Sequence, residues 1–385
     1  MRRVQTAVLV LCAPMLTAHA PAARDAPGFA LDPVGARDLE VNLRIQTRYL
    51  FNRRDEGGAT LANPDSAETL GFVNRRVNVD VRAQVAERLR GRVRLGMNRG
   101  TGQSTLEFAY AQYDIAEGVS LRAGLIRARI VREEHAGASN QLAVERSAGN
   151  ETFNQGFAEG VDLSITRDRW RAFFSITDGF GTSNTSPVNP SEADIAASAR
   201  VETRLGGAPW SAYAMLTSFP DSEPGVMLGA ALSFQHGSDT NPAAAMDTTS
   251  TLITADASVL ADGWNLYASA LVNSADRDTG ADLTDLVLLA QGGVFISERD
   301  ELFLRWNGIF PDADNAPRDE PFRTLTGGWN HYLIPGSQAA KFSIDAVYAF
   351  DPTTTSIVRT GDGHNLLPDA RSGQLAITAQ FQILF

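Results

Sequence analysis

The chain has 385 residues, of which 34 are basic and 45 acidic, so that its formal net charge is −11 at pH 7. This acidic balance argues against a nucleic-acid partner. The single cysteine, Cys12, lies close to the N-terminus, so the rest of the chain can form neither a disulfide nor a thiolate metal site. The basic residues are all arginine except Lys341.

The first residues are typical of a secretory signal. A basic start precedes an apolar run from Ala7 to Leu16, and Ala20-Pro21-Ala22 forms a small-x-small cleavage site. The run is shorter than the about 20 residues that a membrane helix requires. We therefore predict a signal peptide over residues 1–22, followed by a periplasmic N-terminal lead over residues 23–38.

The rest of the sequence repeats one pattern, in which apolar side chains occupy every second position and a polar, glycine- and proline-rich break follows. Over residues 39–48 the odd positions are apolar except Thr47, and the even positions are polar. A period of two indicates a β-strand. Strands of soluble sheets usually have about 5 to 6 residues, whereas a tilted membrane strand needs about 9 to 11. Because most segments reach the longer figure, we predict strands that cross a membrane.

The breaks between these segments alternate between tight turns and long loops, which is typical of membrane barrels. Trp210–Pro224 fits this alternation only as an excursion on the tight-turn side. A barrel whose termini both face the periplasm needs an even number of strands. We therefore predict an all-β, antiparallel transmembrane β-barrel over residues 39–385, with about sixteen strands that begin near residues 39, 72, 89, 105, 119, 157, 169, 194, 226, 250, 263, 284, 301, 322, 339 and 372.

The last segment alternates up to the final residue, with Phe381, Ile383 and Phe385 as its apolar members. Such an aromatic end resembles the signal that the barrel assembly machinery recognises. We therefore expect that machinery as a partner, and the outer membrane of a Gram-negative bacterium as the location after export through the periplasm. Aromatic residues near strand ends are expected to form the interface girdles, namely Tyr49, Phe51, Phe108, Tyr110, Trp264, Trp306, Trp329, Tyr348 and Phe350.

If the apolar set faces lipid, the alternate set faces water inside the barrel. The residues that we expect to line this lumen most densely are Arg76, Arg82, Arg90, Arg92, Arg94 and Arg122. Further members of the same set are Arg44, Arg48, Arg200, Arg204, Arg305, Glu40, Asp80, Glu107, Asp162, Glu202 and Asp345. Like charges along one wall attract anions, and salt weakens the attraction. In the alternative interpretation, the arginines only pair with acids and hold the wall together.

The longest break, residues 127–156, is the candidate for a loop that folds inward and constricts the lumen. The residues that we expect to form this constriction are Arg127, Arg129, Arg132, Glu133 and Glu134. Facing basic and acidic side chains would produce a transverse field that orders dipolar solutes. The alternative is an ordinary solvated surface loop.

Several short motifs resemble the phosphate-selective porin O/P family, with nearly full-length coverage. They are Leu106–Tyr110, Leu121–Arg127, Arg132–Glu134, Gly160–Ser164 and Phe173–Gly179. The resemblance implies a sixteen-stranded, trimeric bacterial outer-membrane porin with a constriction loop after the fifth strand. Phosphate-binding members carry lysine clusters, whereas this chain has one lysine. Arginine can bind oxyanions in a bidentate fork, so an anion bias is carried over and phosphate specificity is not.

Motifs of enzymes are scarce. Glu133-Glu134-His135 lacks a second histidine at helical spacing, and no Gly-x-Ser-x-Gly elbow or phosphate loop occurs. We therefore expect no enzyme activity, no cofactor and no bound metal. The sequence predicts a porin for passive diffusion of small hydrophilic solutes, with a modest preference for anions that extends to phosphate-like oxyanions.

The alternative functions use the same barrel differently. A non-conducting barrel would serve as a structural anchor or as an adhesin through its extracellular loops, and an enzyme would need a site at the loop rim. A soluble exported β-protein is the remaining alternative. For the porin, the expected partners are outer-membrane lipid, lipopolysaccharide, small solutes or anions, and two further copies in a homotrimer.

Overall fold

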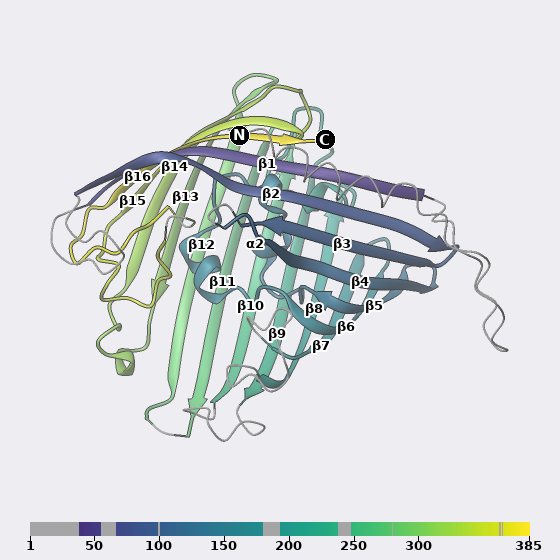
Figure 1. The fold of residues 1–385 in the computed structure, drawn as a ribbon, viewed down its shortest axis with the longest axis horizontal. Helices are drawn as coiled ribbons and strands as arrows, with labels where there is room; N and C mark the ends of the chain where they lie inside the picture. The colour runs from purple at the N-terminus through teal and green to yellow at the C-terminus, as the bar shows by residue number, and fades with distance from the viewer. Residues whose placement is uncertain are drawn as a thin grey trace, which may run out of the picture.

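The computed structural model describes residues 38–54, 67–98, 101–179, 193–237, 248–278, 280–361, 363 and 365–385. Within these ranges, sixteen antiparallel strands pair in chain order and close into a barrel (Figure 1). The predicted signal peptide and nearly all of the predicted N-terminal lead lie outside the described residues. No helix that the structure describes is long and apolar enough to span a bilayer.

The strands are β1 (Asp38–Arg53), β2 (Glu68–Ala86), β3 (Leu89–Met97), β4 (Ser104–Ala116), β5 (Val119–Ile126), β6 (Ala158–Thr166), β7 (Trp170–Thr177), β8 (Ala193–Gly206), β9 (Gly225–Gly237), β10 (Thr248–Ala261), β11 (Trp264–Arg277), β12 (Leu283–Phe295), β13 (Asp300–Phe310), β14 (Phe322–Tyr332), β15 (Ala340–Ala349) and β16 (Leu375–Leu384). The short helices are α2 (Arg132–His135), α3 (Ala148–Phe153), η1 (Ala138–Asn140), η2 (Ala212–Ala214) and η3 (Ala313–Asn315). The strands begin within four residues of the predicted positions. The predicted fold class is therefore confirmed.

The first and last strands join and close the barrel. Their register runs from Arg44 opposite Leu384 to Arg53 opposite Leu375. Beyond it, the amide of Leu43 donates to the carbonyl of Phe385 at 2.6 Å and the amide of Phe385 returns a bond at 3.1 Å. Closure pairs the strand edges, as a sheet in lipid requires.

The outer surface is apolar because the strands alternate. Leu205, Ile253 and Leu304 are 53%, 52% and 56% exposed. Apolar side chains of this size, exposed along many strands, are expected only where lipid covers them. The sequence pattern predicted this outer face correctly.

The interior is asymmetric. Inner-facing apolar residues of β9 to β15 pack into one cluster with Ile130, Val358 and Leu366 from the segments between strands. Arg48, Arg200 and Arg305, which we expected to face water, are only 1%, 2% and 5% exposed. This expectation is corrected, because the connecting segments fold into the barrel and cover the inner face at these three positions on β1, β8 and β13.

Two segments besides 127–157 take part in this filling. The first is residues 350–374, between β15 and β16, in which the amide of Arg359 donates to Thr152 of α3 at 3.2 Å. The second is the excursion between β8 and β9, in which the amide of Leu216 donates to the carbonyl of Asn140 at 3.0 Å. As predicted, the excursion forms no strand. It packs against residues 127–157 inside the barrel.

Candidate functional site

Residues 127–157, called the inward segment below, leave β5 directly after Ile126. Gly124, two residues before the end of β5, has a φ of +126°, and a Cβ there would lie 2.2 Å from the carbonyl oxygen of Ala109. Only glycine adopts such a conformation readily.

The inward segment lies across the lumen, as its contacts with strands around the barrel show. The amide of Val144 donates to Asp345 on β15 at 2.8 Å, and the amide of Gly149 donates to Asn307 on β13 at 2.9 Å. On β10, the hydroxyl of Thr254 donates to the carbonyl of Ile130 at 3.0 Å. A solvated surface loop could not contact all three strands.

The inward segment is also fixed internally. Ser147 caps α3 by accepting a bond from the amide of Asn150 at 3.1 Å. Its own amide and hydroxyl donate to Glu133 at 2.7 and 2.6 Å. Burial raises the pKa of Glu133, although the charge of Arg305 and the bonds from Ser147 oppose that rise. Because Arg132 and Glu133 are only 3% and 1% exposed, they contribute to the packing of the segment.

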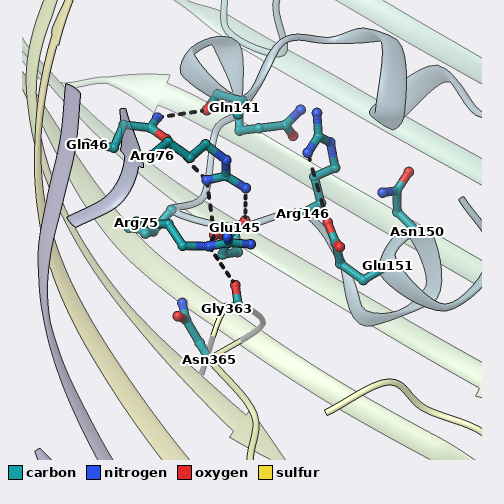
Figure 2. Close-up of polar contacts among 12 residues, drawn as sticks. Gln46, Arg75, Arg76, Gln141, Glu145, Arg146, Asn150, Glu151, Gly363 and Asn365 are labelled. Atoms are coloured by element: carbon teal, nitrogen blue, oxygen red, sulfur yellow. Dashed lines mark hydrogen bonds and ion pairs between the residues drawn. The ribbon is translucent and has the colours of Figure 1, made fainter. Parts of the chain in front are cut away.

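Three arginines of the wall converge on Glu145 of the inward segment. Arg48 on β1 approaches its carboxylate at 2.6 Å, and Arg75 and Arg76 on β2 each approach it at 2.8 Å. Figure 2 shows Arg75 and Arg76 pointing toward Glu145 from the same strand. Burial by itself would raise the pKa of Glu145, but the charges of the three arginines hold it well below its ordinary value.

The same arginines hold residues 350–374. Arg75 also donates to the carbonyl of Gly363 at 3.2 Å (Figure 2), and Arg48 donates to the side chain of Asn365 at 2.9 Å. Glu145 and these arginines, the Glu145 clamp, therefore join the β1–β2 wall to both interior segments.

A second arginine cluster surrounds Asp80 on the neighbouring part of the wall. Arg92 binds this carboxylate at 2.6 Å, Arg94 also binds it, and Arg82 lies 3.5 Å away. Between the two clusters, Arg44 donates to the amide oxygen of Asn78 at 2.9 and 2.5 Å. No carboxylate of the described chain pairs with Arg44. The predicted patch on β2 and β3 is thus brought together and extended onto β1.

Two open cavities lie along this wall. One of about 500 Å³ is lined by Glu40, Arg82, Arg90, Arg92 and Tyr110 toward the tight turns. The other, of about 470 Å³, is lined by Arg75, Arg76, Asn78, Asn98 and Glu107 toward the loops. These cavities follow the arginine-rich inner face of β1 to β4, and a further one of about 360 Å³ continues toward β6 at the tight turns.

The sequence pattern did not predict that two side chains of this wall face inward, because β-bulges interrupt the alternation there. The β1–β2 register shifts between Gln46 and Thr47, and as a result Arg75 faces inward beside Arg76. The β3–β4 register shifts between Arg94 and Leu95, and Phe108 then faces inward. The signal that could have revealed both positions is the local loss of the period of two.

Phe108 was expected in an interface girdle, and this expectation is corrected. Its ring lies 4.4 Å from the guanidinium of Arg92, 5.2 Å from that of Arg94 and 5.8 Å from that of Arg127. Tyr110 also faces inward, because Arg92 donates to its hydroxyl at 3.4 Å.

The remaining predicted residues occur as ion pairs or stacked groups. Arg90 pairs with Asp114 at 2.6 Å, Arg122 pairs with Asp162 at 2.8 Å, and Arg127 pairs with Glu134 at 2.7 Å. Arg129 is stacked over Phe173, 4.3 Å from the ring centre. At the barrel end, Phe381 and Phe385 are exposed, whereas Ile383 is half-buried. Their role in assembly stays a prediction.

The described residues contain no group of three histidine, aspartate or glutamate side chains that could hold a metal ion. The polar groups on the open wall instead form fixed positive and negative charges. Such an arrangement can attract and orient ions in water.

No protein-family model and no curated protein matches the chain. Solved structures do match. An anion-selective porin from Comamonas acidovorans has a TM-score of 0.63 and 12% identity, covering 90% of this chain and 99% of its own. The trimer form of OmpT, an outer membrane protein of Vibrio cholerae, has a TM-score of 0.60 and 13% identity, covering 90% of this chain and 99% of its own.

A third similar structure is the outer membrane channel DcaP of Acinetobacter baumannii. Its TM-score is 0.56 at 12% identity, and the match covers 90% of this chain and 97% of that one. At such low identity the likeness shows the fold alone. The chain has the sixteen-stranded barrel fold found in bacterial outer-membrane porins.

Proposed function

We propose that this chain is a passive channel in the outer membrane of a Gram-negative bacterium, through which small hydrophilic solutes diffuse with a modest preference for anions. The observation that carries the proposal is the arginine surplus beside the open cavities. Eight arginines gather on the inner face of β1 to β3, namely Arg44, Arg48, Arg75, Arg76, Arg82, Arg90, Arg92 and Arg94, of which Arg48 lies covered by the interior segments.

Five carboxylates pair with these arginines. Asp80, Asp114 and Glu145 pair at short distance, while Glu40 lies 3.7 Å from Arg82 and Glu107 lies 3.9 Å from Arg94. Eight positive charges against five negative charges leave a surplus of three. A surplus along one wall of a narrow, low-dielectric passage raises the local concentration of anions.

The inward segment serves as the constriction. It packs against β9 to β15 and reaches the β1–β2 wall at Glu145, while the cavities beside β1 to β4 stay open, so a solute has to pass the arginines. Guanidinium groups bind carboxylates and phosphates through paired N–H donors. The resemblance to the phosphate-selective porin O/P family is consistent with oxyanions as solutes, and we propose no preference for phosphate over other anions.

The proposed setting follows from the apolar outer face. Lipid and lipopolysaccharide surround the barrel, the assembly machinery inserts it, and three copies associate. The similar structure of OmpT from Vibrio cholerae is a trimer form. Cross-linking of detergent-extracted protein should yield trimers, and a monomer throughout would contradict this part of the proposal.

The proposal is tested with purified protein in a planar bilayer under a potassium chloride gradient. We expect discrete open steps and a reversal potential of the sign that chloride preference produces. Because salt screens surface charges, the preference should weaken from 0.1 M to 1 M salt, on the order of the change in Debye length. A reversal potential of the opposite sign would show cation preference and reject the proposed preference for anions.

The filled β9–β15 half favours a second candidate, a non-conducting barrel that serves as an anchor or as an adhesin. The cluster around Ile130, Leu252 and Phe322 resembles a protein core rather than a water-filled channel. Folded barrels that give no conductance in the same bilayer would support this candidate and reject the channel.

A further inference from the structure

Phe108 occupies a particular place on the open wall. Its neighbour Glu107 lines the cavity on the loop side, whereas Tyr110 lines the cavity on the turn side. Phe108 therefore lies on the wall between the two cavities. Its side chain is only 8% exposed, because other groups cover the ring.

The groups that cover the ring are cations on, or directly after, the two strands that flank β4 on the same wall. Arg92 and Arg94 come from β3, and Arg127 comes from the start of the inward segment. Phe157, at the end of the inward segment, meets the edge of the ring at 4.8 Å and 89°, and Arg127 lies 4.2 Å from the ring of Phe157. One phenylalanine thus contacts the wall and both ends of the inward segment.

Stacking fixes a guanidinium group in a way that an ion pair alone does not. The face of an aromatic ring attracts the cation and sets the plane of the group. Asp80 holds Arg92 and Arg94 by their N–H edges, and Glu134 holds Arg127 in the same manner. Each guanidinium group thus has its N–H edge bound to a carboxylate and one face against the ring of Phe108. These contacts keep the three positive charges close together despite their repulsion.

We propose that Phe108 positions these three guanidinium groups on the wall between the two cavities and thereby sets the strength of the anion preference. This inference rests on the proposed channel function. Without the ring, each arginine follows its own carboxylate and the positive charges separate. The passage then keeps every charged residue and loses part of its field.

The test replaces the ring and keeps all charges. Phe108→Leu should lower the anion-to-cation permeability ratio about twofold or more, the change expected when a cation–π contact is lost, while single-channel steps persist. Phe108→Tyr and Phe108→Trp keep a ring and should retain most of the ratio. Phe174→Leu, which removes an exposed ring on β7, is the control and should change nothing.

A second set of variants keeps the ring and changes the cation. Arg92→Lys and Arg127→Lys preserve charge without a planar group, so the ratio should fall in each. Arg323→Lys is the matched control, because Arg323 pairs with Asp351 at 2.7 Å, lines neither cavity and stacks on no ring of the described chain. If Phe108→Leu does not fold, these lysine variants still test whether stacking on Phe108 sets the permeability ratio.

The outcomes separate this inference from the channel function. Absence of steps in the wild type rejects the channel itself. If the wild type is anion-selective and Phe108→Leu leaves its anion-to-cation permeability ratio unchanged, the role of the ring is rejected while the channel function stands. The same conclusion follows if the ratio falls equally in the leucine, tyrosine and tryptophan variants.

Discussion

At the scale of single residues, the two arginine clusters differ in what their carboxylates do. Asp80 lies on the wall beside a cavity and joins residues of two adjacent strands, which backbone bonds already hold together. Glu145 instead joins the wall to segments that no strand pairing fixes. Removing Asp80 should therefore change mainly the charge, and removing Glu145 should change mainly the structure.

Asp80→Asn should strengthen the anion preference. The substitution removes one negative charge and leaves Arg82, Arg92 and Arg94 in place, so that the local surplus rises by one charge. We expect the anion-to-cation permeability ratio to rise about twofold, as measured by reversal potentials at low salt. The double variant Asp80→Asn with Arg82→Gln restores the charge balance and should return the ratio toward the wild-type value. An unchanged ratio in the single variant would show that this cluster does not face the permeating ions.

Glu145→Gln should destabilise the interior segments. Removing one partner of a buried ion pair typically costs about 3 to 5 kcal/mol, and Glu145 has three partners. The folded barrel should persist, because its strands pair without Glu145. Protease sensitivity within residues 127–157 and 350–374 should increase, and single-channel current should become noisier.

The same carboxylate predicts the pH dependence of the clamp. Because the pKa of Glu145 is held well below its ordinary value by Arg76, Arg48 and Arg75 against the effect of burial, its stabilising contribution is complete above the unfolded pKa of about 4.3. The contribution is lost as the pH falls through the lower, folded pKa. Wild type and Glu145→Gln should therefore differ in protease sensitivity at pH 7 and still at pH 4, below the unfolded pKa. A difference that already vanishes at pH 4 would contradict the lowered pKa.

At the scale of elements, the last strand separates stability from assembly. The backbone of Phe385 pairs with Leu43, while its side chain is 61% exposed. Phe385→Ala should therefore leave the folded barrel nearly as stable as the wild type, yet reduce the amount that reaches the folded, heat-modifiable form in cells severalfold. Tyr348→Ala, an exposed aromatic substitution on the neighbouring strand, is the control. If the wild type, Phe385→Ala and Tyr348→Ala give equal yields of the heat-modifiable form, Phe385 has no role in assembly.

The elements also show how far the sequence predicts this fold. Strands are local, and a period of two together with turn residues located all sixteen. The bulges that turn Arg75 and Phe108 inward depend on pairing with a neighbouring strand. The Glu145 clamp joins residues as far apart as Arg48 and Asn365, and no local pattern encodes such contacts. The arginine wall was therefore predictable, whereas the side on which the lumen stays open was not.

At the scale of the whole molecule, the barrel encloses a packed half and an open half. The packed half has an apolar cluster, the capped helix α3 and buried ion pairs, like the interior of a soluble protein. The open half has the two cavities and the surplus of arginine. The passage should therefore be narrower than the barrel and lie off its axis. The single-channel conductance should then depend on the width of the open passage beside β1 to β4.

This asymmetry can be mapped with single cysteines, because the only natural cysteine, Cys12, lies within the predicted signal peptide. Gln112→Cys places a thiol beside the cavity on the turn side, and a charged, water-soluble thiol reagent should modify it rapidly and reduce the single-channel current. Thr326→Cys occupies an inner position of β14 at which the native side chain is 0% exposed. It should react at least about tenfold more slowly, since the reagent needs a local opening of the packed half. Equal rates at both positions would mean that water fills the whole lumen, and the eccentric passage would then have to be abandoned.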